Sequence, residues 1–264
     1  MFPLFLPIFL LVSIVRADVV EVPASSFNSY GELETYWDYL YPWGSDHNGA
    51  ARMVGNSTDH SRISVASGTL TLKATPVTGQ PPSTAAPYPA INYFSGAIHA
   101  KEQININGTD AVGYQVEGEF SSPTAVGVRC WPAFWLTAVN GWPPEADIGE
   151  WKGTNNSWFN TFNTSTVVDT TIVSWPGDYS FHSLKAVLRV IPNNTQDLSI
   201  EYYKDNVLEA THIAANFYGA PMWLIVNLQI AQLSSPVGYA GFSQRDHDLK
   251  IFLNVEAIIF NHSI

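Results

Sequence analysis

Short segments of alternating apolar and polar residues are the feature that most constrains the fold. Residues 62–74 (RISVASGTLTLKA) alternate on both sides of Ser67-Gly68, which is the pattern of a β-hairpin with one face in water. Residues 222–230 (MWLIVNLQI) are nearly continuous in apolar character, which suits a central strand buried on both faces. No segment carries a sustained helical repeat, so roughly a dozen short strands predict an all-β sandwich or jelly roll.

Turn-forming residues separate the other expected strands and leave no linker between them. Further strands are expected at residues 92–102, 112–120, 128–137, 145–151, 181–191, 198–203, 207–213 and 248–260. The Pro- and Ser-rich residues 76–89 form a loop long enough to be the lip of a cleft. Residues 18–49 are rich in aromatic side chains and fit either a short helical turn or a wrapping strand. Their rings are expected to cover one edge of a sheet, with a carbohydrate platform as the alternative.

The N-terminus reads as a cleaved secretion signal over residues 1–17. Its apolar run from Phe2 to Val15 is too short to span a bilayer and is followed by residues of the kind a signal peptidase reads. A membrane-anchored or buried N-terminus is the alternative. We therefore expect residues 18–264 to form one secreted, extracellular domain. Six sequons for N-glycosylation agree with a secretory route, at Asn56, Asn107, Asn155, Asn163, Asn193 and Asn261.

Charge and cysteine content exclude several classes of partner and of stabilisation. The 264 residues include 23 acidic and 12 basic side chains, a formal net charge of −11, which argues against a nucleic-acid or anionic-membrane partner. Sulfated or carboxylated substrates are disfavoured for the same reason. Cys130 is the only cysteine, so no intramolecular disulfide can form. We expect it to be a small buried apolar residue, with a reactive nucleophile as the alternative.

Three carboxyl groups lie within six residues of an aromatic stretch, residues 131–151 (WPAFWLTAVNGWPPEADIGEW). They belong to Glu145, Asp147 and Glu150. Like charges held close together force at least one carboxyl to keep its proton near neutral pH, which provides a general acid beside an ionised base or nucleophile. The stretch is therefore a candidate catalytic site. A calcium site and a solvated charged strand are the alternatives.

Strand geometry makes a specific prediction about these three residues. Glu145 and Asp147 are two apart and project from the same face of a strand, whereas Glu150 has the opposite parity. One β-bulge restores Glu150 to that face, and Gly149 tolerates the backbone angles that a bulge requires. We predict a bulge at Ile148-Gly149. Outer carboxyls separated by about 5–5.5 Å would then fit a retaining glycosidase, with Trp135 and Trp142 placed to stack on sugar rings.

The motif WPAFW at residues 131–135, followed by EADIGE at residues 145–150, resembles glycoside hydrolase family 16. Its E-x-D-x-x-E spacing is similar to that of the laminarinase-like branch of the family. Residues 93–101 (YFSGAIHAK), Phe181-His182 and residues 221–228 (PMWLIVNL) resemble other family strands in the expected order. The resemblance covers most of the mature chain. It implies a concanavalin-like β-jelly-roll sandwich of two antiparallel sheets with a concave substrate cleft.

The resemblance also implies roles for individual residues. Glu145 is similar to the family nucleophile, Glu150 to the general acid/base and Asp147 to the assisting carboxylate, while Trp135 and Trp142 correspond to tryptophans that stack on the glucan. Asn92, Trp131 and Gln229 are further candidates for substrate contact. Asn92 fits a turn residue as well, and Trp131 and Trp151 fit core packing.

The sequence departs from the family where many members place a histidine near the acid/base. Trp158, Phe159 and Phe162 occupy that region here, which affects the expected subsites. His182 matches a family position but is expected to be structural. No metal or other cofactor is expected, although some relatives bind calcium on the convex face.

The resulting hypothesis is a secreted, monomeric glycosidase of the endo-β-1,3(4)-glucanase type. It would cleave β-1,3 or mixed β-1,3/1,4-glucan, a neutral polysaccharide, with retention of configuration. A transglycosylase, a hydrolase of agar-type galactan and a non-catalytic carbohydrate-binding lectin are the alternatives.

Overall fold

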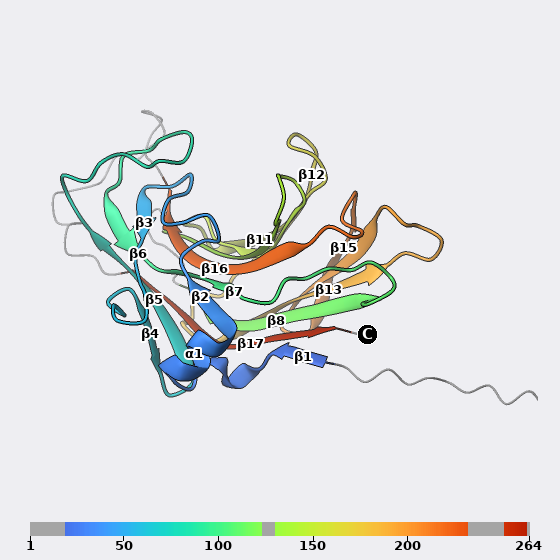
Figure 1. Ribbon diagram of the computed structural model, residues 1–264, viewed down its shortest axis with the longest axis horizontal. Coiled ribbons are helices and arrows are strands. Elements are labelled where there is room, and N and C mark those ends of the chain that lie inside the picture. Colours follow the sequence, from blue (N-terminus) through green and yellow to red (C-terminus); the bar gives the residue numbers. More distant parts are fainter. Residues whose placement is uncertain (1–18, 123–129, 232–250, 263–264) are drawn as a thin grey trace, which may run out of the picture.

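The computed structural model describes residues 19–122, 130–231 and 251–262, and it is a sandwich of two mostly antiparallel sheets (Figure 1). The smaller sheet has seven strands in the order β12-β11-β10-β9-β16-β7-β2. Its strands are Trp37–Tyr39 (β2), Ala97–Ala100 (β7), Cys130–Ala138 (β9), Glu145–Glu150 (β10), Asn156–Phe162 (β11), Val168–Ser174 (β12) and Met222–Ile230 (β16). This sheet carries the site described below.

The larger sheet has ten strands, with the path β15-β14-β13-β8-β17-β5-β6-β3, and with β1 beside β17 and β4 beside β5. Its strands are Val19–Val22 (β1), Ala51–Met53 (β3), Ile63–Ala66 (β4), Thr69–Pro76 (β5), Tyr93–Ser95 (β6), Gly113–Ser121 (β8), His182–Val190 (β13), Leu198–Lys204 (β14), Val207–Ala214 (β15) and Ile251–His262 (β17). The expected all-β jelly roll is confirmed.

Alternation along β9 and β16 builds the core and the cleft from the same strands. The two strands pair without a shift from Met222↔Ala138 to Ile230↔Cys130. Phe134 and Leu136 on β9 are completely buried, while their neighbours Trp131 and Trp135 line a cavity on the opposite face. Successive side chains of a strand point to opposite faces, so the sheet buries one face between the layers and presents the other to the cleft.

Several expected elements are confirmed, and three strands, β3, β11 and β12, were missed. Ser67 and Gly68 have φ of 53° and 80°, as a tight hairpin turn between β4 and β5 requires. β11 and β12 were not expected, because their Asn, Ser and Thr residues resemble loop sequence. β12 is an edge strand with Ile172 55% exposed, so it needs few apolar residues.

The N-terminal aromatic stretch contains a short helix and a strand. Helix α1 (Tyr30–Tyr36) begins at Ser29, whose Oγ accepts a hydrogen bond from the Glu32 N–H at 3.1 Å, and a 3₁₀ turn, η1 (Ala24–Phe27), precedes it. Trp37 and Tyr41 are buried in the core. The proposed secretion signal lies outside the described residues. No helix in the described part of the chain is both long and apolar enough to cross a bilayer.

Candidate active site

The predicted bulge is present in β10. Asp147 pairs with Trp135 and Gly149 with Phe134 of β9, so Ile148 is the extra residue between them. On the other side, the register with β11 shifts between Asp147↔Asn160 and Glu150↔Trp158. Ile148 is fully buried, and the three carboxyl groups of β10 all line one cavity. The sheet therefore brings Glu145, Asp147 and Glu150 together as the parity argument predicts.

The reason for glycine at position 149 differs from the one expected. Its φ is not in the left-handed region that favours glycine. Instead, a Cβ at this position would lie 2.4 Å from Leu184 Cδ1 of β13 and 3.1 Å from Trp151 Cη2. Glycine at this position thus accommodates the close approach of Leu184 from the facing sheet, and the expectation based on backbone angles was wrong.

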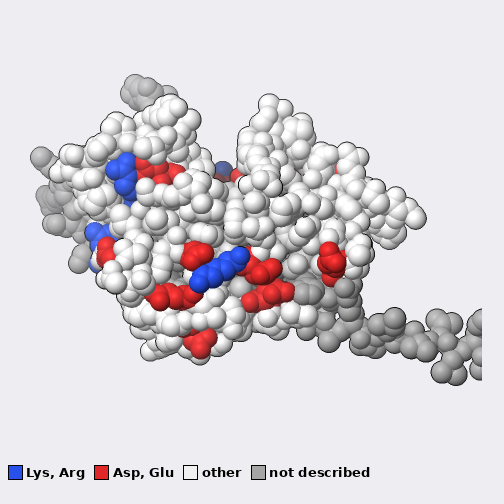
Figure 2. All heavy atoms as spheres, viewed as in Figure 1, with Lys and Arg blue, Asp and Glu red and all other residues white. Residues whose placement is uncertain are grey.

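The cavity has a volume of about 620 Å³ and lies over β9, β10 and β16. Figure 2 shows the surface hollowed between two raised edges. Besides the carboxyl groups, the side chains lining it include Trp43, His47, Trp131, Trp135, Trp142, Lys152, Phe162, Asn227 and Gln229. Ala86, from the loop expected to form a lip, also borders it.

Each outer carboxyl group accepts a hydrogen bond from a tryptophan. The Trp142 Nε1–H donates to Glu145 Oε2 at 2.8 Å, and the Trp131 Nε1–H donates to Glu150 Oε1 at 2.6 Å. Lys152 Nζ lies 2.9 Å from Glu150 Oε2. These donors fix the orientation of both carboxyl groups.

Asn160 of β11 bridges the middle carboxyl group and one outer group. Its Nδ2 donates to Asp147 Oδ2 at 2.8 Å and to Glu150 Oε2 at 2.9 Å. Its Oδ1 accepts from Thr170 Oγ1 at 2.8 Å, and its backbone oxygen accepts from the Tyr202 hydroxyl at 3.1 Å. The amide is therefore held on three sides and places two carboxyl groups relative to each other.

The surroundings keep protons on part of this cluster. Burial, together with the nearby Glu150 charge, raises the pKa of Glu145 to about 7, against the lowering effect of the Trp142 hydrogen bond. Burial, followed by the Glu150 and Glu145 charges, raises the pKa of Asp147 well above its ordinary value, although Asn160 acts in the opposite direction. Burial and the neighbouring charges thus favour protonation of Glu145 and Asp147, as expected for crowded acids.

The other predicted contact residues divide into three groups. Trp131, Trp135 and Trp142 line the cavity, and the Trp135 Nε1–H donates to Asn227 Oδ1 at 2.8 Å. Gln229 borders it too, but its amide is bonded to the backbone of Ala51, with Oε1 accepting at 2.8 Å and Nε2 donating at 3.2 Å. It therefore braces β3 against β16.

Asn92 is not among the residues lining the cavity, so its predicted substrate contact is not supported by its position. It is exposed, and its Nδ2 donates to the Ala90 carbonyl at 3.5 Å, which agrees with the alternative of a turn residue. Trp151 is 1% exposed and packs against Trp175 in the core.

Sequence reasoning missed Asn160, Lys152, Asn227, Trp43 and His47 as residues of the cleft. Asn160 could be predicted as a cleft residue only if β11 were recognised as a strand. Asn160 pairs with Asp147, and this pairing places both side chains on the same face of the sheet. Trp43 is expected to cover a sheet edge with the other rings of residues 18–49. It is instead 47% exposed and lines the cavity, which agrees better with the alternative of a carbohydrate platform.

The other candidate reactive residues, Cys130 and His182, lie outside the cleft lining. Cys130 is buried, and burial raises the pKa of its thiol. His182 is hydrogen bonded to Asp205 at 3.0 Å, away from the cleft lining. Among the described residues, no group of three or more His, Cys, Asp or Glu side chains could hold a metal ion.

Known proteins are similar to this chain in sequence and in fold. The chain is 54% identical over 222 residues to a galactan endo-β-1,3-galactanase of Flammulina velutipes, covering 83% of this chain and 84% of that protein. An endo-1,3-β-glucanase structure from Streptomyces sioyaensis matches with a TM-score of 0.64 and 19% identity, over 90% of this chain and 91% of that chain. SCLam, a non-specific endo-β-1,3(4)-glucanase from family GH16, matches with a TM-score of 0.59 and 18% identity, over 85% and 83% of the two chains. No family model matches.

The jelly roll and these relatives define the class of the protein as a glycoside hydrolase. The chain belongs to glycoside hydrolase family 16.

Proposed function

We propose that the protein is an endo-acting, retaining hydrolase of β-1,3-linked galactan. The observation that carries the chemistry is the bulge that brings three carboxyl groups to one face of the cleft floor. The relative at 54% identity, named as a galactan endo-β-1,3-galactanase, supports galactan as the substrate. It differs from the expectation from sequence alone, in which neutral β-glucan was the substrate and agar-type galactan was one of the alternatives.

Glucan remains the second candidate because the site itself does not exclude it. Both polymers are neutral, and the cleft presents aromatic rings together with carboxyl and amide groups to either. The solved relatives named as glucanases support the shared fold, at identities of 19% and 18%. The E-x-D-x-x-E spacing of the laminarinase-like branch is compatible with both substrates.

The proposed reaction assigns one role to each carboxyl group. Glu145, in its ionised form, attacks the anomeric carbon while Glu150 gives a proton to the leaving glycosidic oxygen. Water then attacks the glycosyl-enzyme, Glu150 takes a proton from that water, and the Glu145 carboxylate is released. Protonated Asp147 lies between them, so it stabilises negative charge on its neighbours without adding a third anion.

A substrate panel tests this proposal. The purified protein is incubated with β-1,3-galactan, laminarin, lichenan, agarose and xyloglucan, and new reducing ends and product sizes are measured. We expect internal cleavage of β-1,3-galactan, with short oligosaccharides of several lengths appearing early. Release from laminarin alone would assign glucan instead, and new products longer than the substrate would assign transglycosylation.

A lectin on the same fold makes the opposite prediction for turnover. It would bind the polysaccharide without producing reducing ends, and Glu145→Gln would change neither property. The hydrolase requires that Glu145→Gln abolish turnover and retain binding.

We also propose that the protein is secreted and N-glycosylated. The apolar residues 2–15 and the six sequons support this, and Asn56, Asn155 and Asn193 are exposed. Treatment of the secreted protein with an N-glycosidase should lower its apparent mass, and N-terminal sequencing should begin at residue 18.

A further inference from the structure

Three rings that line the cavity form an aromatic corner. His47 stacks on Trp135 with centroids 5.9 Å apart and an interplanar angle of 23°, and Trp43 meets Trp135 edge-on at 6.1 Å. Trp43 and His47 are themselves 5.4 Å apart. All three rings line the cavity, so the corner is open to a ligand lying over the carboxyl groups.

Two of these rings come from a loop and need support from outside it. Trp43 and His47 lie between β2 and β3, whereas Trp135 belongs to β9 in the middle of the sheet. Loops are ordinarily more mobile than the strands they connect. A binding surface made partly from this loop therefore depends on what holds residues 43–48 in place.

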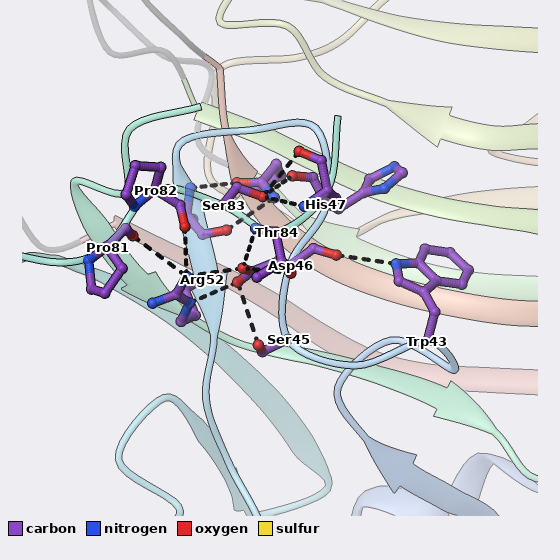
Figure 3. A network of polar contacts seen from close by, with 12 residues as sticks. Trp43, Ser45, Asp46, His47, Arg52, Pro81, Pro82, Ser83 and Thr84 are labelled. Atoms are coloured by element: carbon purple, nitrogen blue, oxygen red, sulfur yellow. Dashed lines mark hydrogen bonds and ion pairs between the residues drawn. The ribbon is translucent and has the colours of Figure 1, made fainter. Parts of the chain in front are cut away.

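Asp46 provides that support as a buried acceptor (Figure 3). Its two carboxylate oxygens accept from Arg52 Nε at 2.7 Å and Arg52 Nη2 at 2.9 Å. The Thr84 N–H and hydroxyl donate to Oδ2 at 2.8 and 3.1 Å. Only 3% of the Asp46 side chain is exposed, and the Arg52 hydrogen bonds lower its pKa to about 2, so the pair is ionic at neutral pH.

The same network fixes the two rings and the neighbouring loop. The Trp43 Nε1–H donates to the Asp46 carbonyl at 3.2 Å, and Ser83 Oγ donates to the His47 carbonyl at 3.0 Å. Arg52 Nη2 also donates to the Pro82 carbonyl at 3.2 Å. Both rings project from the same side of the network (Figure 3). The ion pair thus locks the corner loop to the cleft lip.

We propose that Asp46 and Arg52 are positioning residues, whose ion pair holds Trp43 and His47 beside Trp135 so that the three rings can act together as a hexopyranose-binding subsite. The proposal rests on the proposed function and identifies a group of residues that contributes to substrate affinity. Sugar rings present C–H faces to aromatic side chains and hydroxyl groups around their edges. In the described part of the chain the His47 ring makes aromatic contacts and no hydrogen bond, which leaves its nitrogens for those hydroxyls.

Neutral chemistry at His47 agrees with an uncharged sugar. Burial lowers the pKa of His47 to about 4, so its imidazole is neutral at ordinary pH and provides one donor and one acceptor. A neutral imidazole can donate one hydrogen bond to a sugar hydroxyl and accept one from another.

Binding in an inactive background tests the subsite separately from catalysis. The affinity of β-1,3-galactan and β-1,3-glucan oligosaccharides is measured by titration calorimetry for Glu145→Gln alone and combined with His47→Ala, Asp46→Asn or Arg52→Lys. Lysine keeps the charge of arginine but loses the two-pronged hydrogen bonding. We expect each combination to weaken binding by about tenfold, the scale of an aromatic contact.

The matched control is Arg189→Lys, which changes the Arg189–Glu201 ion pair on the other sheet, at 2.7 Å. It should leave the affinity unchanged. In the catalytically intact protein, the three corner variants should raise KM with little change in kcat. His47→Ala leaves the ion pair in place, so it tests the subsite even if the Asp46 or Arg52 variants fold poorly.

Unchanged affinity in all three corner variants would overturn the proposal, as would a fall in kcat with KM unaltered. An absence of turnover in the wild-type protein, with affinity that still depends on the corner, would instead contradict the proposed function and uphold the subsite. No binding of any oligosaccharide would overturn both.

Discussion

Strands β10 and β13 face each other across the core and differ in how their polar side chains are distributed between the two faces of the sheet. β13 pairs with β8 in an unbroken register from His182↔Phe120 to Arg189↔Gly113. Leu184 and Leu188 point into the core, while Lys185 and Arg189 lie on the other face. In β10, the bulge interrupts this alternation and directs all three carboxyl groups into the cleft.

This difference shows that the geometry of β10 depends on the strands that pack against it. A regular strand such as β13 can place residues two apart on one face, but it cannot place residues five apart there. β10 achieves this only with an extra residue, and a Cβ at Gly149 would force the Leu184 side chain of the facing strand to shift. The site therefore depends on packing across the sandwich as well as on its own motif.

The largest expected effect is the loss of activity when a carboxyl group of β10 is neutralised. Glu150→Gln keeps the shape of the side chain but cannot exchange a proton, so kcat should fall by about 10²–10⁴-fold. Reducing-end release from β-1,3-galactan measures this. A variant that retains more than a tenth of wild-type kcat would remove Glu150 from the acid/base role.

The contact between the two strands predicts a loss of stability. Gly149→Ala introduces a Cβ 2.4 Å from Leu184 Cδ1, and such overpacking costs about 1–3 kcal/mol. Leu184→Ala alone should cost about 2–5 kcal/mol through the cavity it leaves. Because the second change makes room for the first, the double variant should be destabilised by less than the sum in urea unfolding. Additive losses would show that the two positions do not constrain each other.

The buried acids of β10 predict a pH dependence of stability with a definite sign. The pKa of Glu145 is raised from 4.5 to about 7 in the folded protein, so its stabilising contribution is complete below pH 4.5 and is lost as the pH rises through 7. Glu145→Gln should therefore raise the free energy of unfolding relative to wild type at pH 8, and by less at pH 4.

Glu201 on β14 is the control for that experiment. Its hydrogen bonds from Tyr203 and Arg189 lower its pKa, so Glu201→Gln should slightly reduce stability at pH 8. Thermal unfolding of both variants across this pH range compares them. A lower Tm for Glu145→Gln at pH 8 would show that the ionised carboxylate is stabilising there.

The smallest effect is expected on the outer face of β13. Arg189 is 41% exposed and pairs with Glu201, and surface ion pairs contribute about 0–1 kcal/mol. Arg189→Met should change the free energy of unfolding within that range and leave kcat and KM at wild-type values. A large loss of activity would mean that the two sheets are coupled more closely than their packing indicates.

The sequence was sufficient for the parts of the site that lie on one strand. The parity of Glu145, Asp147 and Glu150 predicts the bulge, because strand geometry is local. The role of Asn160 could not be predicted, because it depends on which strand pairs with β10. The polar sequence of β11 also resembles a loop. Asn92 was placed by resemblance alone, and its side chain bonds to its own turn.

Longer-range features could not be inferred from residue patterns. The need for Gly149 arises from Leu184, which is distant in sequence and belongs to the other sheet. The position of His47 depends on an ion pair between Asp46 and Arg52 and on hydrogen bonds to Pro82 and Ser83, in a loop some thirty residues later. Such contacts follow from the folded arrangement of segments and leave no periodic signal in the chain.

The indole groups in the cleft have a consequence for the electric field at the reacting carbon. Trp142 and Trp131 hold Glu145 and Glu150 with N–H donors that carry no net charge. A cation placed against Glu145 in the same way would orient it and also cancel its charge. The oxocarbenium-like transition state of glycoside cleavage carries positive charge on the sugar. At Glu145, the neutral indole donor therefore orients the carboxylate without cancelling its charge, whereas Glu150 also pairs with the Lys152 ammonium.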